Sequence, residues 1–235
     1  MEPLVLLPGL MCDETVWQGQ IDALTNVAEC TCMDWGHLDS LLAMAELVLR
    51  LAPPRFSLAG HSMGGRVAFQ VVRLAPERVT RLALFNTGAD PKPAGAAGVE
   101  EERKRRALLQ VAKEQGMRTM ALQWLPGMMK PGGMANAALV ETIVSMIARK
   151  TPKIYEEQMM ALLNRPDARP GLTKIACPTL LLSADGDSWS PPTRHEEMAK
   201  AIPGSRLVII PDAGHMAPME QPAAVAAAMR DWLAT

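Results

Sequence analysis

Short apolar runs alternate with helical patterns along most of this chain. The runs expected to form strands cover residues 4–7, 27–33, 56–59, 80–85, 178–183 and 206–210. Most are followed by a stretch in which apolar side chains recur every three or four positions. Buried strands that alternate with amphipathic helices are typical of a parallel sheet covered on both faces. We therefore predict an α/β fold with a mostly parallel central sheet and helices on both faces.

The middle of the chain has a different pattern. Residues 89–170 show helical periodicity and no convincing strand, and they contain 8 of the 17 methionines. Breaker-rich sequences, GADPKPAGAAG and NRPDARPG, stand at its two ends. We interpret this segment as an all-helical cap or lid over the carboxyl ends of the strands, where such sheets bind ligands. The predicted organisation is a core in two parts, 1–88 and 171–235, with the cap at 89–170.

Composition narrows the class of protein. The 235 residues are 49% hydrophobic and 21% charged, which suits one large globular domain or a domain with an insertion. A formal net charge of −1 disfavours nucleic acid as a partner. The first apolar run is broken at Pro8-Gly9, so we expect no signal peptide, no membrane span and a cytoplasmic protein. The four cysteines lack metal-ligand spacing, and we expect no metal or other cofactor. The sequence does not distinguish a monomer from a homodimer.

One serine stands where a strand is expected to turn into a helix. The sequence SLAGHSMGGRVAF, residues 57–69, carries Gly60-His61-Ser62-Met63-Gly64 between an apolar run and a helical pattern. The G-x-S-x-G pattern in this context is the nucleophile turn of several hydrolases. A turn this sharp strains the backbone of Ser62 and leaves no room for side chains at the two glycines. We predict Ser62 as a nucleophile.

A serine hydroxyl needs a base, and the chain has only four histidines. His37 lies near the end of the second strand, and His61 is adjacent to Ser62 and points elsewhere. His195 lies in a helical stretch where the apolar stripe predicts a surface position. His215 lies in the loop just beyond the last strand, which can reach the top of the sheet. His215 is therefore the predicted base.

The base in turn needs an orienting acid, for which three aspartates are candidates. Asp185 and Asp187 share the loop SADGDSWSPP after the fifth strand, and Asp90 follows the fourth. A loop after the fifth strand opens onto the same edge as the loop of His215. We favour Asp187 by its place in the loop, although periodicity alone does not separate it from Asp185.

These motifs, taken together, resemble the α/β-hydrolase superfamily, and most of all its small carboxylesterase-type members. The resemblance covers about residues 4–86 and 176–232, and the order Ser…Asp…His is the one described for that fold. In the family the acid commonly stands four residues before a proline, in a G-x-x-D-x-x-x-P-like loop. Asp187 and Pro191 fit this loop, with Ala184 in place of the glycine, and AGHMAPMEQP is similar to the histidine loop of the family.

The resemblance also implies an oxyanion hole made of two backbone N–H groups. One belongs to Met63, directly after the nucleophile, and the other to Leu10, in the loop after the first strand. Family members often have His-Gly in that loop, whereas this chain has Pro8-Gly9. The donor is a backbone amide and is retained, but the hydrogen bonds that support the loop are open to question.

Ser62, His215 and Asp187 together predict acyl transfer, with esters of small to medium hydrophobic acyl or aromatic groups as the small-molecule substrates. The methionine-rich cap and the loop positions suggest a pocket lined by Trp124, Trp189 and Met216. The same three catalytic residues serve thioesterases, lactonases, C–C bond hydrolases and perhydrolases, and some proteins of this fold are non-catalytic small-molecule receptors. A haloalkane dehalogenase is disfavoured because its nucleophile is an aspartate.

Two charged stretches have simpler interpretations. The run EEERKRR at residues 100–106 places three acid-before-base pairs at i,i+4 spacing, which is typical of a solvated helix face. Arg165 and Asp167, in NRPDARP, are expected to pair with each other rather than to bind a substrate carboxylate.

Overall fold

Six parallel strands form the central sheet of the protein, and the computed structural model describes residues 1–235. The strand order is β2-β1-β3-β4-β5-β6, and every neighbouring pair is parallel. The strands are β1 (Glu2–Leu7), β2 (Ala28–Cys32), β3 (Phe56–His61), β4 (Val79–Phe85), β5 (Thr179–Ala184) and β6 (Arg206–Ile210). All six lie where the apolar runs predicted them, within two residues at either end.

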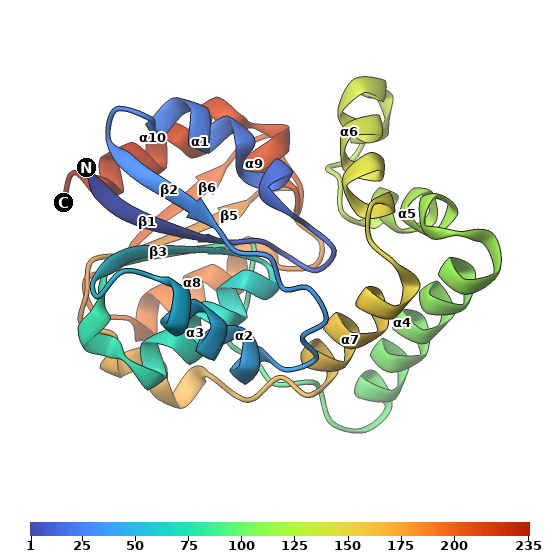
Figure 1. The fold of residues 1–235 in the computed structure, drawn as a ribbon, viewed down its shortest axis with the longest axis horizontal. Coiled ribbons are helices and arrows are strands. Elements are labelled where there is room, and N and C mark those ends of the chain that lie inside the picture. Colours follow the sequence, from blue (N-terminus) through green and yellow to red (C-terminus); the bar gives the residue numbers. More distant parts are fainter.

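Helices cover both faces of this sheet (Figure 1). The first layer contains α1 (Gln18–Leu24), α9 (Ala217–Glu220) and α10 (Pro222–Leu233); the second contains α2 (Leu41–Leu51), α3 (Met63–Leu74) and α8 (Pro192–Ala201). The predicted α/β fold, with a mostly parallel sheet and helices on both faces, is confirmed.

Burial across the sheet follows its position between the two layers. All six residues of the central strand β3 are buried, whereas the edge strands β2 and β6 are partly exposed. A parallel strand covered on both faces gains free energy from burying its apolar side chains, and the two polar side chains of β3, Ser57 and His61, are buried with hydrogen bonds. Because all strands are parallel, their carboxyl ends and the loops that follow them lie along one edge of the sheet.

Between β4 and β5 the chain forms only helices. They are α4 (Gly95–Gln115), α5 (Met117–Trp124), α6 (Ala137–Ala148) and α7 (Pro152–Leu163), together with short 3-10 turns. Figure 1 shows them beyond the carboxyl ends of the strands, apart from the two layers that cover the sheet. We call these four helices and their connections the α4–α7 segment. None of the helices in the protein has both the length and the apolar character that a membrane crossing requires.

The charged run on α4 forms the ion pairs expected from its spacing. Three glutamates each bind the base four residues later, and most of these side chains are at least partly exposed. The pairs are Glu100–Lys104 at 3.7 Å, Glu101–Arg105 at 3.0 Å and Glu102–Arg106 at 2.7 Å.

Candidate active site

Ser62 occupies the sharp turn between β3 and α3. Its backbone has φ 54° and ψ −114°, a strained conformation for any residue with a side chain. The neighbouring glycines allow the turn, because a Cβ on Gly60 would lie 2.5 Å from the carbonyl oxygen of Gly64, and a Cβ on Gly64 would collide with the backbone of Leu7. The G-x-S-x-G spacing is thus a requirement of close backbone packing in this protein.

Hydrogen bonds to neighbouring strand ends hold the turn in this shape. The Ser62 N–H donates to the carbonyl of Phe85 at 2.9 Å, and Thr87 Oγ1 donates to the Ser62 carbonyl at 2.7 Å. The helix α3 begins at Met63, so its positive end lies beside the serine. Negative charge that develops near Ser62 is stabilised by that end of the helix.

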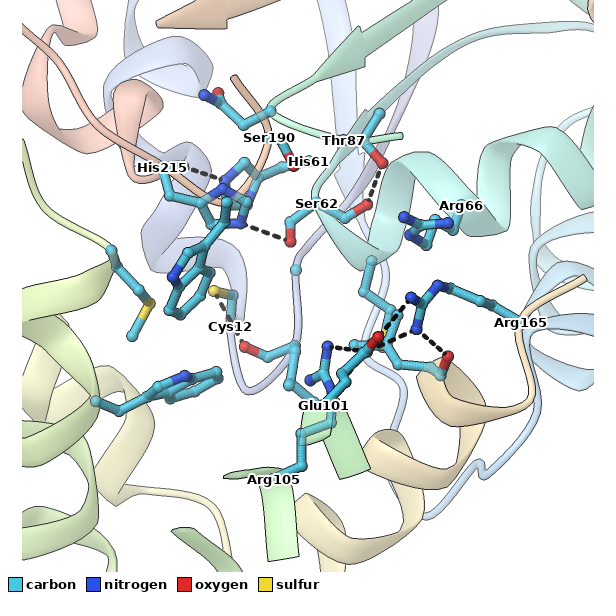
Figure 2. Close-up of a pocket in the computed structure, with 18 of the residues that line it drawn as sticks. Cys12, His61, Ser62, Arg66, Thr87, Glu101, Arg105, Arg165, Ser190 and His215 are labelled. Carbon is cyan, nitrogen blue, oxygen red and sulfur yellow. Dashed lines mark hydrogen bonds and ion pairs between the residues drawn. The ribbon is translucent and has the colours of Figure 1, made fainter. Parts of the chain in front are cut away.

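The loop after β6 brings His215 to the serine. His215 Nε2 lies 2.8 Å from Ser62 Oγ, and only 5% of the histidine is exposed (Figure 2). The His215 N–H donates to the carbonyl of Met128 at 2.7 Å, which ties the loop to the α4–α7 segment. This distance and orientation allow the imidazole to accept the proton of the serine hydroxyl.

The loop after β5 brings one of its two aspartates to the histidine. Asp187 Oδ2 lies 2.9 Å from His215 Nδ1, and Asp187 is buried. Asp185 is exposed, and its carboxylate faces the N–H of Ala213 instead. Asp90 lies elsewhere, with its carboxylate 3.6 Å from Arg194. The structure therefore brings together Ser62, His215 and Asp187, and places the other two candidate acids outside this chain of hydrogen bonds.

Three donors surround the Asp187 carboxylate. Asn86 Nδ2 donates to Oδ2 at 3.0 Å, and the N–H groups of Trp189 and Ser190 donate to Oδ1 at 2.9 Å each. Burial by itself raises the pKa of Asp187, but the nearby His215 and these hydrogen bonds outweigh it and hold the pKa well below its usual range. Asp187 is therefore ionised at neutral pH and can stabilise a positive charge on His215.

The two residues predicted to supply oxyanion donors lie in the same cavity as the serine. Leu10 and Met63 both line the cavity that contains Ser62 and His215. The Leu10 N–H makes no hydrogen bond within the chain. The Met63 N–H is the first of α3, where helical N–H groups have no partner in the helix. Both N–H groups are thus free to donate a hydrogen bond to a ligand oxygen.

The loop that carries Leu10 is held by two hydrogen bonds that its sequence did not reveal. Trp35 Nε1 donates to the carbonyl of Pro8 at 3.0 Å, and the side-chain oxygen of Gln158, on α7, accepts the N–H of Met11 at 2.9 Å. Trp35 and Gln158 are fully buried. The proline in place of the family histidine therefore leaves a loop that is fixed from both sides.

The three residues predicted to bind substrate line this same cavity, whose volume is about 410 Å³. The Trp189 ring centre lies 5.0 Å from that of His215 and 5.8 Å from the stacked ring of Trp124. Met216 is buried next to the base. The side of the cavity nearest His215 is thus aromatic and apolar.

Sequence reasoning missed two polar residues around the base. Asn86 directly follows β4 with a positive φ of 47°, and its side chain also donates to the carbonyl of Gly214 at 3.3 Å. His61 Nε2 donates to the carbonyl of His215 at 2.8 Å. Burial, followed by the nearby His215, lowers the pKa of His61 to about 3, so this imidazole is neutral at pH 7. The one available signal was the asparagine, which tolerates positive φ better than most residues.

His195 is not the surface residue that the sequence predicted. It is fully buried on α8, and its Nε2 accepts the N–H of Thr87 at 3.3 Å. Burial lowers the pKa of His195 to about 4. The prediction failed because His195 stands three residues before Met198 and seven before Ile202, so it lies on the buried stripe of α8, while Glu196 and Glu197 form the exposed face.

The predicted pairing of Arg165 with Asp167 is also wrong. Arg165 makes two hydrogen bonds of 2.7 Å to the carboxylate of Glu101, on α4, and Asp167 instead binds Arg169. The partner of Arg165 is 64 residues away in the sequence, so only the packing of α4 against the end of α7 creates the pair.

No group of three or more His, Cys, Asp or Glu side chains is arranged to hold a metal ion.

The parallel sheet, the strained serine turn and the hydrogen-bonded Ser62, His215 and Asp187 are features of one class of fold, the α/β hydrolases. A family model described as the alpha/beta hydrolase family matches residues 4–228, and the chain belongs to this family.

Several relatives within the family are esterases or other hydrolases. A pimeloyl-[acyl-carrier protein] methyl ester esterase from Nitrosomonas europaea is 28% identical over 90% of this chain and 88% of its own length. A structure of a thermophilic esterase from Thermogutta terrifontis, with malate bound, is 31% identical, covers 100% of this chain and 90% of that one, and has a TM-score of 0.87. The enol-lactonase of Burkholderia xenovorans shares the fold, with 23% identity, a TM-score of 0.86 and coverage of 100% and 92%.

Proposed function

We propose that this protein hydrolyses carboxylic esters of small molecules through an acyl-enzyme on Ser62. The observation that carries the proposal is the unbroken series from Ser62 Oγ to His215 Nε2 at 2.8 Å and from His215 Nδ1 to Asp187 Oδ2 at 2.9 Å. The esterases among its relatives support the same class of reaction.

In the first half of the reaction Ser62 Oγ attacks the carbonyl carbon of the ester, and its proton passes to His215 Nε2. The N–H groups of Leu10 and Met63 donate to the oxyanion of the tetrahedral intermediate. When the C–O bond to the alcohol breaks, the imidazolium of His215 gives its proton to the departing oxygen. Asp187 stabilises that imidazolium throughout.

In the second half, water attacks the acyl-enzyme carbonyl and gives a proton to His215, which then returns it to Ser62 Oγ. The products are one carboxylic acid and one alcohol. The aromatic and apolar walls around Trp124, Trp189 and Met216 favour substrates with a small or medium hydrophobic or aromatic part.

The test is a p-nitrophenyl ester series from acetate to octanoate, assayed with the wild-type protein and with Ser62→Ala. We expect turnover by the wild type and a loss of at least about 1,000-fold in kcat for the variant, because no other group replaces the nucleophile. Thioesters and lactones assayed in parallel define the class of bond. Tight ligand binding without turnover of any substrate would indicate a receptor and contradict the proposal.

A further inference from the structure

The cavity above Ser62 is unusually rich in positive charge on one side. Five cationic side chains line it and only one carboxylate does, that of Glu101. The cations are Arg66, Lys104, Arg105, Arg165 and Arg194. A cavity of about 410 Å³ that holds such an excess of charge is expected to attract an anionic ligand.

The carboxylates near these cations do not balance them. Glu101 is shared by two arginines, with Arg165 at 2.7 Å and Arg105 at 3.0 Å. Arg194 lies 3.6 Å from Asp90, and Lys104 lies on the exposed rim, 3.7 Å from Glu100. One cation is therefore left without a carboxylate at ion-pair distance.

That cation is Arg66, which lies one helical turn beyond Ser62 on α3. It makes no ion pair, and its one hydrogen bond is from Nη1 to the backbone carbonyl of Asp90 at 2.6 Å. Its Nε and Nη2 have no partner within the chain. Burial, followed by the like charges of Arg165 and Arg194, outweighs the opposite effect of Asp90 and Glu101 and lowers the pKa of Arg66 to about 9, so it stays charged at neutral pH.

The neighbouring Arg165 gives a second, independent observation. Its side chain is only 8% exposed, yet its Nε has no hydrogen-bond partner. Figure 2 shows the Arg66 and Arg165 side chains on the same wall of the cavity, with Ser62 between this wall and His215. Two guanidinium groups of like charge on one wall, Arg165 buried and Arg66 half-buried, are stabilised by an anion that both can reach.

The position of His215 decides which half of an ester faces these arginines. His215 protonates the departing alcohol, so the alcohol half lies on the His215 side, next to Trp189. The acyl half, which stays on Ser62, then extends toward the opposite wall. A charged group bound there belongs to the acyl half of the substrate.

We propose that Arg66, with Arg165 beside it, forms a subsite for a carboxylate on the acyl half, so that the preferred substrates are monoesters of dicarboxylic acids. The proposal rests on the proposed function and names its substrate class. The planar guanidinium matches a carboxylate with two parallel hydrogen bonds, and Arg66 keeps two free nitrogen donors for this purpose.

The experiment compares the monomethyl esters of succinate, glutarate and adipate with the same molecules in which a primary amide replaces the free carboxylate. Acid release is followed in a pH-stat at low ionic strength. We expect kcat/KM for the best carboxylate substrate to exceed that of its amide by about 10- to 100-fold, mostly through KM. Arg66→Gln brings this ratio close to one, and Arg66→Lys, which keeps the charge but loses the planar fork, gives an intermediate ratio.

Arg73→Gln is the matched control, because Arg73 is exposed on the same helix and lies outside the cavity. We expect it to leave the ratio unchanged. A wild-type ratio near one, or a ratio that survives in Arg66→Gln, overturns the subsite.

Binding to the Ser62→Ala protein separates the two proposals. Calorimetry with glutarate and adipate should show binding that weakens about tenfold or more in the Ser62→Ala, Arg66→Gln double variant and as the salt concentration rises. Tighter binding of inorganic phosphate than of every dicarboxylate overturns the assignment to a carboxylate. If dicarboxylate binding depends on Arg66 but the wild-type protein hydrolyses no ester, the subsite is supported and the proposed function is contradicted. If the wild-type protein hydrolyses esters without preferring a free carboxylate, the proposed function is supported and the subsite is contradicted.

Discussion

The α/β core and the α4–α7 segment hold their cavity residues in different ways. Ser62, Asp187 and His215 follow strand ends of one rigid sheet, and backbone hydrogen bonds fix the turns around them. The α4–α7 segment is joined to the core partly by ion pairs at the surface, such as Arg149–Asp13 at 2.8 Å, which contribute little to stability. The comparison indicates that the core sets the geometry of the reaction and that the segment sets the fit of the substrate.

The largest expected effect comes from a change in the core. Asp187→Asn should lower kcat by about 10³- to 10⁴-fold, because a neutral amide cannot stabilise the His215 imidazolium and favours the wrong tautomer. Steady-state kinetics on an ester substrate measures the loss. Asp185→Asn is the matched control on the same loop and should retain full kcat. A greater loss in the control would mean that the acid has been assigned to the wrong aspartate.

The stability of the folded protein should fall in acid because of a buried histidine in the core. The pKa of His195 is lowered to about 4 in the folded protein, against about 6.5 when unfolded. Because the pKa is lower in the folded protein, neutral His195 contributes to the free energy of unfolding. This contribution is complete above pH 6.5 and is lost as the pH falls toward 4. The loss is about 3 kcal/mol of the free energy of unfolding for this one group.

Urea unfolding between pH 7.5 and 4.5 measures this dependence. His195→Gln, which cannot take up a proton, should have a flatter dependence on pH, whatever its stability at pH 7.5. An unchanged slope in the variant would show that other groups, such as the buried His61, account for the acid sensitivity.

The contact between the two regions offers the next test. Gly214 packs against the backbone of residues 128–130, and a Cβ there would lie 2.6 Å from the carbonyl carbon of Met129. Gly214→Ala should displace the adjacent His215 and lower kcat by about 10- to 100-fold. Gly171→Ala, where a Cβ would have no atom within 4 Å, should leave kcat unchanged under the same assay. Equal kinetics for both variants would mean that the base does not depend on this contact.

The smallest expected effect lies in the α4–α7 segment itself. Trp124→Ala should raise KM for aromatic or medium-chain esters by up to about tenfold, with little change in kcat, because it removes a stacked ring from the wall and none of the reacting groups. Leu122→Ala, on the exposed face of the same helix, serves as the control. A fall in kcat without a rise in KM would contradict the assignment of substrate fit to the segment and of reaction geometry to the core.

Much of this architecture could be predicted from sequence because it depends on local patterns. The apolar runs located all six strands, and the glycines around Ser62 located the turn. The loop positions of Asp187 and His215 followed from the strand order along the chain. These features depend on neighbours in sequence or on the parallel topology, both of which the residue pattern reveals.

The residues that escaped prediction depend on contacts between distant segments. Asn86 reaches Asp187 across 101 residues, and Arg165 reaches Glu101 across 64. His195 is the exception, because it shares the buried stripe of α8 with Met198 and Ile202, and that spacing was visible in the sequence. The unpaired state of Arg66 is likewise a property of the assembled cavity, since its sequence neighbourhood differs little from that of any helical arginine.

Two hydrogen bonds join the α4–α7 segment to the loops around the serine. The Met128 carbonyl accepts the His215 N–H, and the Gln158 side chain accepts the N–H of Met11, next to Leu10 in the loop after β1. An ester too bulky for the cavity must push this segment outward, and that movement would pull on His215 and on the loop of Leu10 together. Oversized esters are therefore expected to react slowly even when they bind. The same contacts would then select against bulky substrates both in binding and in the reaction.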